Sequence, residues 1–383
     1  GYAGVNIFGL TLGISSFLII LLVIRFELSF DKFHADSDKI FRINNELRLS
    51  SGNYKYPTCT SALAPALTDQ LPEVVKYTRM NGGGQQLVIE VETELYKEHN
   101  SFFVDPNFLA FFNFTLLQGE KSQVLAAPNS VVLTEAAAIK YFGNTNVVGK
   151  MLKVKGQQEL SYKVTGLLKN LPKNTHIAFD IIFSRNQGNN NFLNSWSNDG
   201  FYSYIKLTDA AHASMLPAKI NELKSANIEE GRLHMFNPEL IALHDIHLQS
   251  NLRNEISVNG SMDFVLIFMA IGVFVLLIAG INYMNLATAR SAKRAKEVGI
   301  RKVLGAYKKQ LIGQFLGESL VLAGISAILS LIIVYFLAPS FANFIGKPIL
   351  SDMLFQPEVL GVLGLIVVVI GLGSGSYPAL FLS

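Results

Sequence analysis

The stretch ATARSAKRAKEVGIRKVLGAYKKQ, residues 287–310, decides how the rest of this 383-residue chain is organised. It carries eight basic residues and one acidic residue, a net charge of +7, and it lies between two long apolar runs. Lys and Arg in short loops between membrane spans bias those loops toward the cytoplasm. We therefore expect residues 287–310 to form a cytoplasmic loop and the flanking apolar runs to cross a membrane.

Composition points to the same class of protein. Half of the residues are apolar and only 16% are charged, whereas soluble domains typically carry about 25% charged residues. Residues 28–262 hold 22 basic and 23 acidic side chains, a net charge of −1, so the basic excess belongs to the loop alone. A nucleic-acid-binding protein would spread basic residues over a domain face with stacking aromatic residues, and that class is excluded here.

Four segments approach the roughly 20 apolar residues that a transmembrane helix requires. The predicted spans are Val5–Ile24, Phe264–Leu286, Leu320–Leu337 and Val359–Leu372. With residues 287–310 inside, both termini lie inside and residues 28–262 lie outside. The predicted domains are therefore transmembrane helix 1 in residues 1–27, an extracytoplasmic domain in residues 28–262, and helices 2–4 in residues 263–383.

Strand and helix signals alternate in residues 28–262, which predicts a large α+β domain inserted between helices 1 and 2. Its predicted helices are Ser61–Leu71 and Glu135–Phe142, the second capped by Thr134 and stopped by Gly143. Its predicted strands are Val131–Leu133, Phe201–Leu207, and a hairpin of Met151–Val154 with Tyr162–Leu167.

Two further expectations concern the course of the chain through this domain. The polar run at residues 186–191 is a break between two α+β subdomains. Residues Asp31–Ile43 continue span 1 as a helix, and the residues before Phe264 extend span 2, so that the pair forms a stalk. Phe30, Phe33 and Phe41 would bury part of the contact between these extensions.

Patterns for catalysis or metal binding are weak. GNTNVVGK, residues 143–150, has five residues between its glycines, and Met151 stands where a phosphate loop has Ser or Thr, so a turn after a helix is the better interpretation. His244 and His247 have no further ligand nearby. The lone Cys59 cannot form an internal disulfide and is interpreted as a small semi-buried side chain. We predict no catalytic residue, no metal site and no cofactor, hence no enzyme.

The predicted spans offer packing residues but no ionisable group at mid-span. Gly9 and Gly13 form a GxxxG pattern that allows close helix approach in lipid, although such a pair also arises by chance in a glycine-rich span. The absence of a carboxylate or histidine at mid-span argues against proton- or ion-coupled transport. Energy for transport would then come from a partner protein.

The basic loop contains one apolar helical side, formed by Val298, Ile300, Val303 and Leu304. Two interpretations stay open. The helix either lies on anionic lipid through its Lys and Arg residues, or docks into a partner protein. Docking would need Glu297 and the apolar side in a fixed register, whereas lipid binding would not.

The segment NYMNLATARSAKRAKEVGIRKVLGAYKKQLIGQFLGESL, residues 282–320, resembles the membrane core of MacB/FtsX-type ABC permeases. The outer domain resembles the MacB-type periplasmic core of that family. The phrases that carry this second resemblance are FELSFDKFHADSDKIFRIN (26–44), SVVLTEAAAIKYFGN (130–144), VTGLLKNLPKNTHIAFDIIFS (164–184) and LHDIHLQSNL (243–252). GSGSYPALFLS, residues 373–383, is similar to the end of the family's fourth span.

The resemblance implies a multi-pass protein of the bacterial cytoplasmic (inner) membrane, with its large domain in the periplasm. It implies a cytoplasmic ABC ATPase docked on a coupling helix, which we assign to Lys296, Glu297, Val298, Gly299, Ile300, Arg301, Leu304 and Gly305. It also implies a second permease copy, as a homodimer or the other half of a duplicated chain, and leaves room for a periplasmic adaptor or outer-membrane factor. This chain would be a fragment or half of a longer permease.

Two functions follow from the resemblance and stay open. In the first, the chain is a permease subunit that uses ATP hydrolysis by its partner to export or extract a substrate from the periplasm or membrane. In the second, it is an FtsX-like regulator that transmits ATPase motion to a periplasmic enzyme or sensor without transport. A concave, substrate-sized surface on the outer domain would favour the first.

Overall fold

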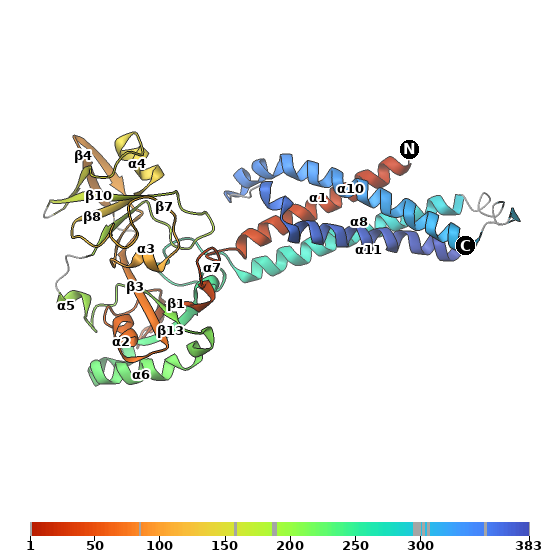
Figure 1. Cartoon of the computed structure of the whole chain (residues 1–383). Helices are drawn as coiled ribbons and strands as arrows, with labels where there is room; N and C mark the ends of the chain where they lie inside the picture. Colours follow the sequence, from red (N-terminus) through yellow and green to blue (C-terminus); the bar gives the residue numbers. More distant parts are fainter. Residues whose placement is uncertain are drawn as a thin grey trace. The chain divides into compact units, whose positions relative to one another are not determined.

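The computed structural model describes residues 2–83, 86–156, 159–185, 190–293, 300, 303–304, 307–347 and 351–382. The chain forms two compact units. One unit joins Gly1–Leu28 to Met262–Ser383 and is helical, whereas the other, Ser29–Ser261, is an α+β unit (Figure 1).

Within the described residues, the helical unit contains four helices that are long and apolar enough to cross a membrane. They are α1 (Tyr2–Glu27), α8 (Met262–Lys293), α10 (Lys308–Ile345) and α11 (Pro357–Leu382). The prediction of four spans around a large α+β domain is confirmed. The helix α10 starts twelve residues before the predicted span, so it also contains the carboxylate of Glu318.

Among the four apolar helices of the helical unit, α1 is the most buried. Its residues Leu10, Ile14, Leu18 and Leu22 recur every four positions and are fully buried. In its most apolar stretch 44% of residues are buried inside the protein, compared with 17% for α8. Most of α8 therefore has its apolar side chains free to face lipid or another protein.

Small and hydroxyl-bearing residues allow the close approach of other helices to α1. A Cβ atom built on Gly13 would overlap Cβ of Ala279 on α8, so Gly13 is needed for the observed spacing. A Cβ on Gly9 would lie 3.7 Å from Nδ2 of Asn282, which is an ordinary contact. On the α10 side, the Ser330 hydroxyl donates to the carbonyl oxygen of Thr11 at 3.0 Å.

One mixed sheet runs through the α+β unit, with thirteen strands among the described residues. Its strands are β1 (Ile40–Leu49), β2 (Gly52–Tyr56), β3 (Val74–Gly82), β4 (Leu87–Val91), β5 (Glu94–Glu98), β6 (Ser101–Val104), β7 (Leu116–Gln118), β8 (Ser130–Thr134), β9 (Met151–Lys155), β10 (Leu160–Leu168), β11 (Ile181–Ser184), β12 (Tyr202–Leu207) and β13 (Asn237–Ala242). The order is β13-β1-β12-β3-β6-β11-β8-β10-β9-β4-β5, with β2 on β1 and β7 on β10. Among the strand pairs of the described residues, only β8 with β10 and β6 with β11 are parallel.

Short helices cover the sheet and complete three apolar clusters. The α-helices are α2 (Leu63–Gln70), α3 (Phe108–Phe111), α4 (Glu135–Phe142), α5 (Asn190–Leu193), α6 (Leu216–Asn227) and α7 (Ile246–Gln249). The 3₁₀ helices are η1 (Ser37–Lys39), η2 (Ala210–Ser214), η3 (Glu230–Met235) and η4 (Leu243–Asp245), with η5 (Ser351–Phe355) in the helical unit. The largest cluster is aromatic and gathers Phe102, Phe108, Phe112, Phe114 and Phe179.

Local sequence signals predict several of these elements well. The helix α4 covers the predicted residues, the Thr134 hydroxyl accepts a hydrogen bond from the Ala137 amide, and Gly143 ends the helix at φ 71°. The strands β9 and β10 pair as the predicted antiparallel hairpin. The run at residues 186–191 lies for the most part outside the described residues.

The expected helical stalk is wrong. The helix α1 ends at Glu27, and residues 28–39 form turns and the single turn η1 before β1 begins at Ile40. Asp31 and Asp36 adopt left-handed backbone angles, φ 59° and 54°, which a continuing helix excludes. Phe30, Phe33 and Phe41 instead pack within the α+β unit. No helix is seen in residues 251–261, where Asn254 also has a left-handed φ of 68°.

The contact at Gly13 gives a direct test of helix packing. Gly13→Ala should lower the thermal stability of the detergent-solubilised chain, because its Cβ has no room beside Ala279. Gly324→Ala in α10 is the matched control, since nothing lies within 4 Å of its Cβ. Ala is favoured over Gly by about 1 kcal/mol inside a helix, so the control should be neutral or slightly stabilised. Equal melting temperatures for the two variants would contradict the close α1–α8 contact.

Candidate functional site

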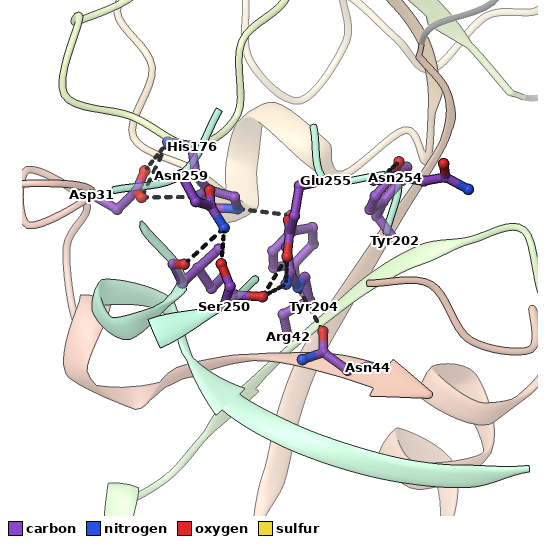
Figure 2. Close-up of polar contacts among 11 residues, drawn as sticks. Asp31, Arg42, Asn44, His176, Tyr202, Tyr204, Ser250, Asn254, Glu255 and Asn259 are labelled. Carbon is purple, nitrogen blue, oxygen red and sulfur yellow. Dashed lines mark hydrogen bonds and ion pairs between the residues drawn. The ribbon is translucent and has the colours of Figure 1, made fainter. Parts of the chain in front are cut away.

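The chain enters and leaves the α+β unit through two segments that are held together by buried polar side chains. The N-terminal segment comprises residues 29–44 and the C-terminal segment comprises residues 250–261. We call the set that joins these segments to each other and to the sheet the junction network (Figure 2). Its members are Asp31, Arg42, Asn44, His176, Tyr204, Ser250 and Glu255.

The strongest link in the junction network is the ion pair between Arg42 and Glu255. Arg42 is fully buried on β1, and its Nη1 and Nη2 atoms each donate to one Glu255 oxygen at 2.7 Å. Nη2 also donates to Oγ of Ser250 at 2.9 Å, and Nε donates to Oδ1 of Asn44 at 2.8 Å. Such a bidentate pair fixes both distance and orientation. It therefore joins the N-terminal segment to the C-terminal segment.

A second link anchors the N-terminal segment to the centre of the sheet. Nδ1 of His176 lies 2.7 Å from Oδ2 of Asp31, and Nε2 lies 2.9 Å from the Tyr204 hydroxyl. Burial opposes ionisation of Asp31, but the charge and hydrogen bonds of His176 favour it, and the Thr175 hydroxyl donates a further hydrogen bond at 2.7 Å. Together these contacts lower the pKa of Asp31 below its usual value. The carboxylate can only accept, so Nδ1 carries a proton, and Tyr204 donates to Nε2 when the ring is neutral.

The C-terminal segment is fastened at two more points. The Tyr202 hydroxyl donates to the carbonyl oxygen of Asn254 at 2.7 Å, and the Asn259 amide donates to the carbonyl oxygens of Ser250 and Ile246. Nearby, the rings of Phe30 and His247 stack with centroids 3.3 Å apart. Residues from both segments are therefore held against the same core.

The part of the junction network formed by Asp31, His176 and Tyr204 is sealed and cannot work as a catalytic site. Asp31 and Tyr204 have no solvent-exposed surface and His176 is 1% exposed, so no substrate reaches them. Burial raises the pKa of the Tyr204 hydroxyl, which keeps the phenol protonated. The network is therefore structural: it orients backbone segments and does not transfer protons to a ligand.

The other chemical candidates from the sequence also have structural roles. Residues 143–150 form a turn between α4 and β9, and Cys59 is buried in a bridge to Phe201, where burial raises its thiol pKa to about 12. His244 lies in η4 and His247 lies in α7. Among the described residues, no three His, Cys, Asp or Glu side chains are arranged to hold a metal ion.

The assigned coupling helix falls largely outside the described residues. That holds for Lys296, Glu297, Val298, Gly299, Arg301 and Gly305. Ile300 and Leu304 are described: the Leu304 amide donates to the Ile300 carbonyl oxygen at 3.0 Å, as in a helical turn. Ile300 is 54% exposed and Leu304 is 81% exposed, so these apolar side chains are not covered by the described part of the chain.

One cleft of about 620 Å³ opens on the α+β unit. Residues of the C-terminal segment line one of its walls, namely Asn254, Glu255 and Ile256. Its volume lies within the range of about 300–1,000 Å³ found for ligand sites. The junction network and the cleft therefore share Glu255.

Comparison with known proteins gives the family of the chain. A family model described as MacB-like periplasmic core domain matches residues 3–223, and one described as FtsX-like permease C-terminal matches residues 269–383. The chain belongs to this family of MacB/FtsX-type ABC transporter permeases. With its four apolar helices, it is a multi-pass membrane protein.

Individual relatives share modest identity with the chain. It is 27% identical over 217 residues to the uncharacterized ABC transporter permease YknZ of Bacillus subtilis (strain 168), covering 55% of this chain and 49% of that protein. It is 35% identical over 68 residues to the macrolide export ATP-binding/permease protein MacB of Nitrobacter winogradskyi, covering 18% and 10%. A solved permease domain from Porphyromonas gingivalis matches with 21% identity and a TM-score of 0.46, covering 53% of this chain and 87% of that one. The chain thus spans about half or less of the two curated relatives.

Sequence reasoning missed the junction network, although one signal was present. Arg42 stands among Ile40, Phe41 and Ile43 at the apolar start of β1, and a charge that is buried there requires a partner. That partner, Glu255, lies 213 residues away. The pattern could have predicted the need for a counter-charge but not its identity.

The ion pair predicts a large and specific loss of stability. Arg42→Met should lower the free energy of unfolding by about 3–5 kcal/mol, because Glu255 is left as a largely buried charge without its counter-ion. Replacing both residues by Met should cost less than the sum of the single changes. Lys55→Met is the control, since its pair with Glu239 is exposed and worth at most about 1 kcal/mol. A loss for Arg42→Met as small as the control's, in urea unfolding of the full chain, would show that the pair is not coupled.

A buried histidine predicts acid sensitivity. Burial lowers the pKa of His34 from 6.5 to about 4, against the attraction of Asp31, with the charges of His176 and Lys121 also lowering it. The unfolded chain therefore binds a proton near pH 6.5 that the folded chain binds only near pH 4. Stability should fall as the pH drops through this window, by at most about 3 kcal/mol.

The variant His34→Asn should flatten this dependence, because its amide oxygen can still accept the Asn113 amide that now donates to Nδ1 at 3.0 Å. Melting temperatures between pH 7 and pH 4 measure the effect, with His212→Asn on the surface as the control. An unchanged slope in His34→Asn would assign the acid sensitivity to other groups.

Proposed function

We propose that the chain is the permease subunit of an ABC-type transporter that couples ATP hydrolysis by a partner ATPase to movements of its α+β unit. On this proposal residues 28–262 are the periplasmic domain, residues 1–27 and 263–383 lie in the bacterial inner membrane, and residues 287–310 contact the ATPase in the cytoplasm. The family of the chain and the +7 charge of the loop support this arrangement.

The observation that carries the proposal is the junction network. The only covalent connections between the two units are at Leu28–Ser29 and Ser261–Met262. On the α+β side of each connection lies a segment that Arg42 and Glu255 tie to the other. A displacement of α1 relative to α8 would therefore act on a joined pair of segments and be passed to the sheet, since β1 lies beside β12 and β13.

The helical unit has a matching feature at the end of α1. Arg25 donates to the side-chain oxygen of Gln356 at 2.7 Å and lies 3.5 Å from Glu358, while Glu27 pairs with Lys347. These contacts fasten the end of α1 to the connection between α10 and α11. On this proposal α1, α10 and α11 move together, and α8, which is the least buried helix, is the element that moves against them.

The cleft supports transport over regulation without transport. A regulator needs only a surface for its partner enzyme, whereas a transporter that extracts a substrate needs a concave site of substrate size. The cleft meets that requirement. A second permease copy and a periplasmic adaptor belong to the proposal through the family alone.

The test is the loop that contacts the ATPase. Glu297→Lys should weaken co-purification of the partner ATPase and uncouple its hydrolysis, because docking depends on Glu297 and the apolar side formed with Val298 and Leu304. Lys308→Ala and Lys309→Ala should matter much less, and the purified chain alone should hydrolyse no ATP. Intact association in Glu297→Lys, with loss in the two lysine variants, would identify the loop as a lipid anchor instead.

A further inference from the structure

Three of the seven histidines of the chain are buried at one short stretch of the N-terminal segment, which begins at Phe30 and ends at His34. His247 stacks on the ring of Phe30, and Nδ1 of His176 lies 2.7 Å from Oδ2 of Asp31. The third histidine, His34, belongs to the stretch itself. Because histidine is the side chain whose charge ordinarily changes between pH 5 and 8, this stretch is a place where the fold can respond to pH.

Two hydrogen bonds fasten the stretch to the loop that follows α3. The Asn113 amide donates to Nδ1 of His34 at 3.0 Å, and the Ala35 amide donates to Oδ1 of Asn113 at 3.0 Å. Because a backbone N–H only donates, Nδ1 is the acceptor and the proton of the neutral ring is on Nε2. We call this pair of hydrogen bonds the His34 clip. It holds the imidazole beside the rings of Phe112 and Phe114, with centroids 5.0 Å and 5.1 Å away.

The other ring nitrogen of His34 lies near a carboxylate without being bonded to it. Within the described part of the chain Nε2 has no hydrogen-bond partner, and Oδ1 of Asp31 lies 4.0 Å away. Neither side chain has exposed surface. A movement of the ring by about 1 Å would close this gap to the length of a charge-assisted hydrogen bond. His34 therefore lies between an amide that requires an unprotonated Nδ1 and a carboxylate that attracts a charged ring.

Burial and the surrounding charges keep His34 neutral at pH 7 while the clip is closed. Burial has the largest effect on the pKa of His34, which falls from 6.5 to about 4 although the charge of Asp31 raises it. His176, from the loop before β11, and Lys121, from the loop after β7, also lower this pKa. Residues 112–115, on the loop after α3, carry no charge. A ring released into water would return to its ordinary pKa, so acid favours the open clip.

We propose that the His34 clip is an acid-sensitive switch that releases the start of the N-terminal segment from the loop after α3. When Nδ1 takes a proton it becomes a donor that faces the N–H of Asn113, so this hydrogen bond breaks. The charged ring then turns toward Asp31, and the bond between Ala35 and Asn113 loses its support. The rest of the α+β unit stays folded. The inference does not depend on the proposed function, because it concerns contacts within this unit alone.

The two pKa values give the expected size of the effect. If the ring titrates at 6.5 in the open clip and at about 4 in the closed clip, opening becomes about 20-fold more favourable between pH 7 and pH 5. The open form binds the proton more tightly, so opening increases as the pH falls below 6.5 and levels off below about pH 4.

Hydrogen exchange of the full chain in detergent, followed by mass spectrometry, measures the release. After correction for the intrinsic pH dependence of exchange, protection of residues 30–38 and 110–116 should fall about 20-fold from pH 7 to pH 5. Because the release is local, protection there should stay well below that of β8 at both pH values. Equal protection of these residues and β8 would show that the clip opens only with the whole unit, and would overturn the proposal.

Matched histidine variants assign the effect to one side chain. His34→Asn keeps an acceptor for the Asn113 amide but cannot take a proton in this range, so the pH dependence of protection at residues 30–38 should disappear. His212→Asn removes a histidine in η2, outside the clip, and should retain the full change. An unchanged pH dependence in His34→Asn, or its loss in His212→Asn, would contradict the role of His34.

A second measurement on the unmodified chain decides the matter if His34→Asn does not fold. Exchange of the imidazole C2 hydrogen for deuterium, measured over a range of pH, reports the pKa of His34 directly. The expected value is about 4, because the closed clip resists protonation. A value near 6.5 would show that His34 takes its proton without opening the clip, and the proposed release would then be wrong.

Discussion

The buried guanidinium of Arg42 is the constraint on which the organisation of the α+β unit depends. A fully buried charge is tolerated only with a counter-charge at hydrogen-bonding distance, and the chain supplies one 213 residues later, in Glu255. Satisfying Arg42 brings the two ends of the unit together. The sheet places β1 between β12 and β13, and the ion pair holds the C-terminal segment beside β1.

Joining the two segments by an ion pair has consequences that an apolar contact would not have. Replacing a buried ion pair by well-packed apolar side chains often leaves stability unchanged, so net stabilisation alone does not account for its use. A bidentate pair is directional, however, and it fails abruptly when either partner moves by a fraction of its length. Apolar side chains slide and repack. On the proposed function the two segments move as one body, and Arg42 and Glu255 would then join them better than apolar packing.

The sequence predicts those features of the fold that local chemistry determines. Apolar length alone determines the four spans, and Thr134 and Gly143 mark the two ends of α4 because capping needs only neighbouring residues. The prediction of a helical stalk was wrong because Asp31 and Asp36 adopt left-handed backbone angles. Nothing about an acidic residue in an amphipathic pattern indicates such an angle. The junction network was missed for a different reason. Which side chains meet in it depends on the order of the strands in the sheet. The periodicity of the sequence does not predict that order in a mixed sheet whose strands pair over long distances.

Sharing Glu255 between the junction network and the cleft has a thermodynamic consequence. If a ligand in the cleft favours one position of the C-terminal segment, then any force that shifts this segment must change the affinity of the cleft by the same factor. Coupling of this kind needs no channel through the helices. Motion imposed from the membrane side through α8 would weaken or strengthen binding directly, and a bound ligand would in turn bias α8. On the proposed function, a single short segment of twelve residues would thus serve both to receive the movement and to release the substrate, which is why its attachment to Arg42 must be rigid.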